Sequence, residues 1–171
     1  MWYYWLLLPT LLVPEGYLKA RSYQKPMVGR LLDLEFRSQT LRIQCGYHLN
    51  EGSAIGYWAP SLQSALGPIG IKVTIACGVL ATCVFVWLLR KTESRCGLLG
   101  TIFLIAGGVG NMADRLYVGG VIDYLLLQTH GPLVNTSFFW NLSDLYIDFA
   151  VIFLFIAIFL GELPGDEKKE Q

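Results

Sequence analysis

The chain has 171 residues, of which 54% are hydrophobic and 15% are charged. Ordinary soluble domains carry about 25% charged residues, so this composition favours a protein that resides in a lipid bilayer. Because 13 basic side chains balance 13 acidic ones, the excess positive charge typical of nucleic-acid-binding proteins is missing, and nucleic acid is excluded as a partner.

The cysteines and histidines form no recognisable metal or redox motif. The four cysteines have neither CxxC spacing nor a nearby histidine pair, and the two histidines, His48 and His130, are far apart in the sequence. We therefore expect no bound metal and no cofactor.

The first apolar run is predicted to form a membrane-spanning helix over residues 2–23. A helix needs about 20 apolar residues to cross a bilayer, and this run reaches that length only if it continues past Pro14, Glu15 and Lys19. The four-residue spacing from Glu15 to Lys19 suits an ordinary helical ion pair, or a lysine that extends to the membrane surface. No small-residue cleavage site follows the run, so we expect the helix to be retained.

Residues 24–68 are predicted to lie outside the membrane. Apolar and polar side chains alternate over residues 41–49, which predicts a half-buried strand within a small extracytoplasmic β-sheet. Residues 50–68 are rich in Gly, Ser, Trp and Tyr, which favours a segment at the membrane interface. Our hypothesis is that this segment and the extracytoplasmic strands form a lid.

Three further spans are predicted at residues 69–89, 96–112 and 142–161. The run over residues 96–112 is rich in glycine, as closely packed membrane helices often are. The whole chain is therefore expected to be a single integral-membrane domain, mainly α, with four transmembrane helices. The charged residues 165–171 are expected to form a disordered tail.

Basic residues give the orientation of these spans. The loop at residues 90–95 contains three of them, and Lys168 and Lys169 follow the last span, so the positive-inside rule makes this side and both termini cytoplasmic. Four basic residues within residues 24–68 oppose this assignment, although a folded extracytoplasmic segment can translocate despite its charge.

Carboxylates gather where the third and fourth spans reach the extracytoplasmic face. An aspartate at a helix centre costs about 2.5 to 3.5 kcal/mol, so such residues usually mark a functional site or an interior pair. Asp123 follows the third span and Asp144 opens the fourth, and antiparallel neighbouring spans would bring them to the same face. Two adjacent carboxylates share a proton. Such a pair can activate water and protonate a departing amide, as peptide hydrolysis requires.

Each of these residues also has a structural explanation. Asp144 could equally be the N-cap of the last helix, and Asp123 could lie in an exposed turn or strand edge. Asp114 and Arg115 suit an interfacial anchor or a salt bridge, and the glycines within residues 107–110 suit close helix packing. Their joint occurrence favours a functional site.

The same residues resemble the motifs of lipoprotein signal peptidases (signal peptidase II). Residues 107–115, GGVGNMADR, resemble the family's GGAxGNxxDR motif; residues 121–124, VIDY, look like VxDF; residues 139–144, FWNLSD, look like FNxAD. Upstream, residues 50–56, NEGSAIG, are similar to NxGxAFG, and residues 15–19, EGYLK, lie where the family has DxxxK. Order and spacing agree over nearly the whole chain.

The resemblance implies that Asp123 and Asp144 are the catalytic residues of an aspartic endopeptidase. It implies a supporting group that holds them and the substrate, made up of Asn111, Asp114, Arg115, Asn141, Asn50, Gly52, Glu15 and Lys19. The implied substrate is a diacylglyceryl-modified prolipoprotein, cut just before its lipidated cysteine. The implied location is the bacterial cytoplasmic (inner) membrane, in contact with membrane lipid and with the active site near the extracytoplasmic face. We expect a monomer.

Several residues complicate this resemblance. Glu15 replaces the usual Asp, Leu18 occupies the place of a small hydroxyl residue, Trp140 stands where Phe is usual, and Ser143 replaces the usual Ala beside Asp144. The Ser143 hydroxyl could donate a hydrogen bond to a carboxylate of the pair, or it could cap the helix. Asp148 lies one turn beyond Asp144, and if it faced the pair its charge would raise a neighbour's pKa.

Two other functions remain open from the sequence. A small ion or solute transporter would use the carboxylates and Lys19 along an ion path, but polar residues would then follow the depth of several helices rather than lie near one face. An inactive homologue that binds lipoproteins without cutting them would fit the replacements at Glu15 and Ser143, but the chain retains Asp123 and Asp144.

Overall fold

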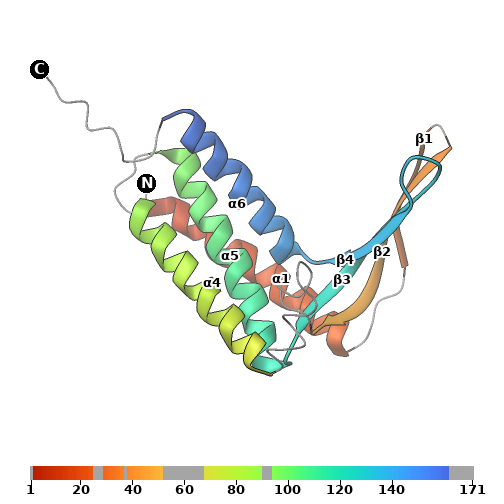
Figure 1. The fold of residues 1–171 in the computed structure, drawn as a ribbon, viewed down its shortest axis with the longest axis horizontal. Coiled ribbons are helices and arrows are strands. Elements are labelled where there is room, and N and C mark those ends of the chain that lie inside the picture. The colour runs from red at the N-terminus through yellow and green to blue at the C-terminus, as the bar shows by residue number, and fades with distance from the viewer. Residues whose placement is uncertain (1, 25–28, 37, 52–67, 90–93, 162–171) are drawn as a thin grey trace, which may run out of the picture.

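The computed structural model describes residues 2–24, 29–36, 38–51, 68–89 and 94–161. The helices form a bundle, and a sheet extends from one end of it (Figure 1). In chain order the elements are η1 (Trp2–Leu6), α1 (Leu7–Gln24), β1 (Gly29–Phe36), β2 (Gln39–Asn50), α4 (Pro68–Leu89), α5 (Arg95–Tyr117), β3 (Val121–His130), β4 (Thr136–Trp140) and α6 (Leu142–Phe159).

The helices lie in the four regions predicted from the sequence, with two differences. The first predicted span begins with the 3-10 helix η1 and becomes α-helical only at Leu7. The third helix, α5, continues to Tyr117, past the predicted end at residue 112. The extra turn keeps Asp114 within the helix, where its side chain accepts a hydrogen bond from the backbone N–H of Ile122 at 3.0 Å. η1 and the last turn of α6 lie at the end of the bundle remote from the sheet (Figure 1).

Two of the described helices, Arg95–Tyr117 and Leu142–Phe159, are long and apolar enough by length and composition to cross a membrane. α4 contributes a shorter apolar stretch, Ile75–Val84. α1 carries the charged residues Glu15 and Lys19, both of which are buried inside the protein. The four-span layout therefore stays a prediction.

Glycines allow α5 and α6 to pack in direct contact. A Cβ atom at Gly107 would overlap the backbone oxygen of Ser143, and one at Gly110 would overlap the Ser143 hydroxyl. Two turns earlier on α5, a Cβ atom at Gly100 would overlap the side chain of Leu154 on α6. Small residues are common where membrane helices approach closely, so the packing interpretation agrees with the structure at Gly107 and Gly110, whereas Gly108 lines a cavity.

The four strands form one antiparallel sheet in the order β1-β2-β3-β4. The strand predicted at residues 41–49 is confirmed as part of β2. β2 pairs with β3 from Thr40 opposite His130 to Asn50 opposite Val121. This register brings the end of β2 to the start of β3, where the strand meets the helical bundle.

Buried residues concentrate at this junction between sheet and bundle. The first four residues of β3, from Val121 to Tyr124, are all buried, whereas the rest of the strand becomes progressively more exposed. Asn141, which connects β4 to α6, has no exposed surface. The junction is therefore where side chains of the helices and the sheet can interact away from solvent.

Candidate active site

α6 begins with a capping box formed by Asn141 and Asp144. The Asn141 side-chain oxygen accepts the backbone N–H of Asp144 at 3.0 Å, and the backbone N–H of Asn141 donates to the Asp144 carboxylate at 3.3 Å. Both bonds satisfy donors at a helix start that lack an intrahelical partner. The N-cap is Asn141, so the alternative that Asp144 is itself the N-cap is wrong; Asp144 lies three positions into the motif.

Asn141 also reaches the second aspartate. Its side-chain Nδ2 donates to Oδ1 of Asp123 at 2.7 Å, and Nδ2 of Asn50 donates to Oδ2 of Asp123 at 3.3 Å. Asp123 is only 2% exposed, so the alternative of an exposed turn is wrong. One asparagine thus contacts both Asp123 and Asp144, which we call the carboxylate pair.

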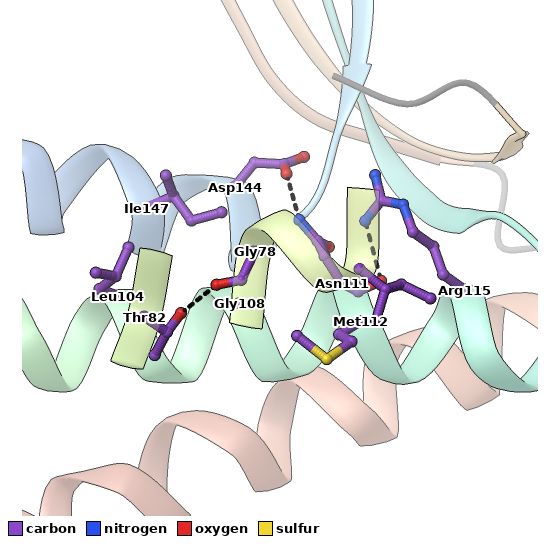
Figure 2. Close-up of a pocket in the computed structure, with 10 residues that line it drawn as sticks. Gly78, Thr82, Leu104, Gly108, Asn111, Met112, Arg115, Asp144 and Ile147 are labelled. Carbon is purple, nitrogen blue, oxygen red and sulfur yellow. Dashed lines mark hydrogen bonds between the residues drawn. The ribbon is translucent and has the colours of Figure 1, made fainter. Parts of the chain in front are cut away.

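Asn111 on α5 supports the other member of the pair. Its Nδ2 donates to Oδ1 of Asp144 at 2.7 Å, while its backbone oxygen accepts a hydrogen bond from the Arg115 guanidinium at 3.1 Å. Figure 2 shows Asp144, Asn111 and Arg115 gathered on one side of a pocket. A positively charged group therefore lies close to the pair.

The environment of Asp123 favours its protonated form. Burial and the negative charge of Asp144 raise the pKa of Asp123 to about 6, although the hydrogen bonds from Asn141 and Asn50 and the charge of Lys19 act in the opposite direction. An unperturbed aspartate has a pKa of about 3.9. Two neighbouring carboxylates in different environments can divide the roles of acid and base.

A buried group of charged residues lies behind the pair: Glu15, Lys19 and Asp114, here called the charge cluster. The Lys19 ammonium lies 3.0 Å from Oε1 of Glu15 and 2.8 Å from Oδ2 of Asp114, and it donates to the Asn111 side-chain oxygen at 3.0 Å. Glu15 is 1% exposed and Lys19 is 3% exposed. The i,i+4 ion pair between Glu15 and Lys19 that the sequence predicted is present, and Lys19 forms a second ion pair with Asp114. Buried charges need such partners.

Asp114 forms a salt bridge, as one interpretation of the sequence predicted, and its partner is Lys19. Arg115 donates instead to the backbone oxygen of Asn111. Adjacent helical residues do not face each other, so the two side chains have separate partners.

The described members of the predicted supporting group all contact the carboxylate pair or one another, with Asn50, Asn111 and Asn141 on the pair itself. Gly52 lies outside the described residues, as do residues 52–67 of the predicted lid and the predicted tail. Asp148 is exposed on α6, so it is not part of this buried group. Within the part of the chain that the structure describes, no three His, Cys, Asp or Glu side chains are arranged to hold a metal ion.

A cavity of about 290 Å³ opens beside the pair, between α4, α5 and α6. Leu104 and Ile147 lie toward one end of it, and Asp144 and Arg115 lie toward the other (Figure 2). The described residues that line the cavity are Ile75, Gly78, Thr82, Leu104, Gly108, Asn111, Met112, Arg115, Asp144 and Ile147. The cavity is therefore apolar along most of its length and carries a carboxylate and a guanidinium at one end.

Comparison with known families agrees with this geometry. The family model described as Signal peptidase (SPase) II matches residues 22–160, well over half of the chain. The chain belongs to the signal peptidase II family.

Several proteins named lipoprotein signal peptidase are similar to this signal peptidase II chain over part of its length. The protein of Nitrobacter hamburgensis is 30% identical over 96 residues, which cover 54% of this chain and 57% of the relative. The protein of Streptococcus pneumoniae is 36% identical over 83 residues (47% and 51%), and that of Brucella ovis is 31% identical over 112 residues (66% and 64%). The chain thus spans about half to two thirds of the length of these relatives.

Two solved structures, each described as a bacterial membrane enzyme, share the fold. The first has a TM-score of 0.66 at 17% identity and covers 97% of this chain and 93% of its own. The second has a TM-score of 0.61 at 18% identity and covers 90% of each chain.

Tyr124 is a residue of this signal peptidase II site that the sequence analysis missed. Its hydroxyl donates to Oε2 of Glu15 at 2.5 Å and accepts the backbone N–H of Leu142 at 3.1 Å. Burial and the Glu15 carboxylate raise the pKa of Tyr124, so the phenol keeps the proton that it donates. The available signal was a tyrosine where the VxDF motif has phenylalanine. Ser143 was noticed, but its hydroxyl donates to Glu15 at 2.7 Å rather than to the carboxylate pair.

Proposed function

We propose that this chain is a membrane aspartic endopeptidase that removes signal peptides from diacylglyceryl-modified prolipoproteins and cuts just before the lipidated cysteine. The observation that carries the proposal is the placement of Asp123 and Asp144 on a single bridging residue, Asn141, beside an apolar cavity. Relatives named lipoprotein signal peptidase support the choice of substrate.

In the proposed reaction Asp123 is the acid and Asp144 is the base. Asp123 keeps its proton to a higher pH than an ordinary aspartate, because burial and its neighbour raise its pKa to about 6. Asp144 accepts hydrogen bonds from Asn111 and Asn141 and lies at the start of α6, where the helix dipole favours a negative charge. Ionised Asp144 takes a proton from water, the water oxygen bonds to the scissile carbonyl carbon, and Asp123 then protonates the departing nitrogen. The reaction needs no cofactor.

Arg115 is assigned to the substrate carbonyl. It lines the cavity next to Asp144, and one of its five N–H donors is used by the backbone oxygen of Asn111. Charge develops on the carbonyl oxygen when water adds, and a fixed donor aimed at that oxygen lowers the barrier. Arg115 would therefore stabilise the tetrahedral intermediate that the carboxylate pair creates.

The cavity provides the contacts that position the peptide bond. Its apolar part, which includes Leu104 and Ile147, suits an apolar segment of a signal peptide or an acyl chain. Binding energy from such remote contacts can hold the reacting bond against the catalytic groups. The carboxylate lies at one end of the cavity, so a substrate that enters along the helices would present its cleavage site there.

We place the active site at the extracytoplasmic face of the bacterial cytoplasmic membrane, with the helices α1, α4, α5 and α6 crossing it. Two of these helices have spanning length and composition. The sheet lies at one end of the bundle, and both ends of the described chain lie at the other (Figure 1). This arrangement supports cytoplasmic termini, as the basic residues near them predict.

The test is cleavage of a synthetic diacylglyceryl-modified prolipoprotein by the purified chain in detergent micelles. The parent should release the signal peptide, and Asp123→Asn and Asp144→Asn should each abolish release while remaining folded. Asp148→Asn is the matched control, because it removes an exposed carboxylate one turn from Asp144 and should leave cleavage intact. A folded parent that cleaves nothing would favour a binding or transport role, and cleavage by either pair variant would mean that the pair is wrongly assigned.

A further inference from the structure

The first turn of α6 is held by side chains from two other elements. The backbone N–H of Leu142 donates to the Tyr124 hydroxyl on β3 at 3.1 Å, and the backbone N–H of Ser143 donates to Oε1 of Glu15 on α1 at 3.2 Å. Donors at a helix start have no intrahelical partner. Here α1 and β3 provide partners for two of these donors, and so they fix where the helix begins.

Glu15 joins these side chains into one set, here called the Glu15 network: Glu15, Tyr124 and Ser143. Each oxygen of the Glu15 carboxylate accepts one hydroxyl, Oε1 from Ser143 at 2.7 Å and Oε2 from Tyr124 at 2.5 Å. Exposure is 1% for Glu15, 2% for Tyr124 and 0% for Ser143. Hydrogen bonds to an ionised group are shorter and stronger than neutral ones, so this buried set is expected to be rigid.

The network contacts the chain immediately beside each member of the carboxylate pair. Tyr124 directly follows Asp123, and Ser143 directly precedes Asp144. Neither hydroxyl contacts the pair, and neither residue lines the cavity. We propose that the Glu15 network holds Asp123 and Asp144 at their working separation, which makes Tyr124 and Ser143 positioning residues for peptide hydrolysis. The inference rests on the proposed function.

The sequence offers a second observation, because all three members are among the positions that depart from the motifs that the chain resembles. Glutamate stands for aspartate in DxxxK, tyrosine for phenylalanine in VxDF and serine for alanine in FNxAD. The three positions are far apart in the chain, yet their side chains meet. A carboxylate longer by one methylene is met by two added hydroxyl donors, so the three replacements compensate one another.

The first experiment measures kcat and KM for prolipoprotein cleavage by Tyr124→Phe and Ser143→Ala. Misplacement of catalytic groups by about an ångström can cost roughly 100-fold in rate, so we expect kcat to fall by about 10- to 100-fold. KM should change by less than about twofold, because substrate contacts outside the reacting centre are unchanged. The triple variant Glu15→Asp/Tyr124→Phe/Ser143→Ala should recover much of the lost kcat, since it restores a mutually compatible set.

Two matched controls remove the same atoms elsewhere. Tyr146→Phe deletes a hydroxyl that donates to the backbone oxygen of Leu11 at 3.3 Å and also links α6 to α1. Ser22→Ala deletes a buried hydroxyl that has no hydrogen-bond partner within the described residues. Both should keep the parental kcat, even where thermal stability falls as much as in the network variants.

An infrared pH titration of the Asp123 carboxyl in the full chain, assigned with Asp123→Asn, reports on the pair without any substrate. Burial and the charge of Asp144 are the two largest influences on the pKa of Asp123 and both raise it, so a loosened network should move the titration to lower pH. Unchanged kcat and unchanged titration in both network variants would overturn the inference. A titration shift together with an inactive parent would support the positioning role and refute the proposed function.

Discussion

An Asp123→Asn variant is expected to lose cleavage and to gain stability near neutral pH, because the carboxyl group that donates the proton in the reaction is costly to ionise in its buried place. Asp123 is 2% exposed and lies beside Asp144, and both conditions raise its pKa to about 6. In the unfolded chain the same carboxyl ionises near pH 3.8. The folded state therefore binds more protons than the unfolded state between these two values.

The sign and the size of the effect follow from this difference. Stability falls as pH rises wherever the folded state binds more protons, so the loss runs from pH 3.8 to about 6 and is complete above it. A shift of about two pKa units corresponds to about 3 kcal/mol. Asn141 and Asn50 both donate to Asp123, but an asparagine there has a single side-chain oxygen to accept them. The lost hydrogen bond lowers the stability of the variant by about 1 kcal/mol at every pH. The net gain is about 2 kcal/mol near neutral pH.

The assay is reversible unfolding in mixed micelles, with the parent and Asp123→Asn compared across this pH range. The difference in unfolding free energy should grow with pH and then level off. Asp33→Asn is the matched control, because Asp33 pairs with Arg30 at 3.1 Å and Arg42 at 2.8 Å on the partly exposed face of β1 and β2, and its loss should stabilise nothing. A pH-independent difference, or a variant that is less stable at every pH, would refute the reasoning.

Three further variants test the packing and the charges around the pair. Lys19→Met leaves two buried carboxylates without their counter-ion and should lower the unfolding free energy by about 3–5 kcal/mol. Gly107→Ala places a methyl group against the backbone of α6 and should cost about 1–3 kcal/mol in the same unfolding assay. Asp144→Asn removes the neighbouring negative charge and should lower the pKa of Asp123 in the infrared titration.

Each of these expectations has a contrasting result. Gly16→Ala on α1 adds the same methyl group where nothing lies within 4 Å, so it should be neutral or slightly stabilising. If the two alanine substitutions lowered the unfolding free energy equally, the effect at Gly107 could not be due to the close contact of α5 with α6. A fully stable Lys19→Met would show that the Lys19 ammonium does not stabilise the charge cluster. An unmoved Asp123 titration in Asp144→Asn would show that the two carboxylates do not interact.

The meeting of Asp123 with Asp144 could be anticipated because it depends on coarse features. Two consecutive antiparallel helices return the chain to the same face, and that holds whatever the details of packing. The strand at residues 41–49 was equally accessible, because apolar and polar side chains alternate along it. Residues 121–124 gave no such signal, since both faces of β3 are covered at the junction and the apolar run does not alternate.

Partners that depend on tertiary contact were not accessible from the sequence. A salt bridge was one interpretation of Asp114, but the sequence does not identify its partner, which is Lys19 from a helix at the other end of the chain. The hydroxyl of Tyr124 reaches Glu15 across a separation of 109 residues, and no local pattern predicts that contact. The contact between Tyr124 and Glu15 can be suspected only when the replacements at these two positions, in separate motifs, are considered together.

The close contact of α5 with α6 divides the site into a rigid half and an adaptable half. Because Gly107 and Gly110 have no side chains, α5 packs directly against Ser143 of α6, with no room between them for a methyl group. Arg115 on α5 and Asp144 on α6 are therefore expected to move together. The opposite wall of the cavity comes from α4, whose small residues there include Gly78. We therefore expect α4 to shift when signal peptides of different size bind. The positions of Arg115 and Asp144 relative to each other should stay the same from one substrate to the next.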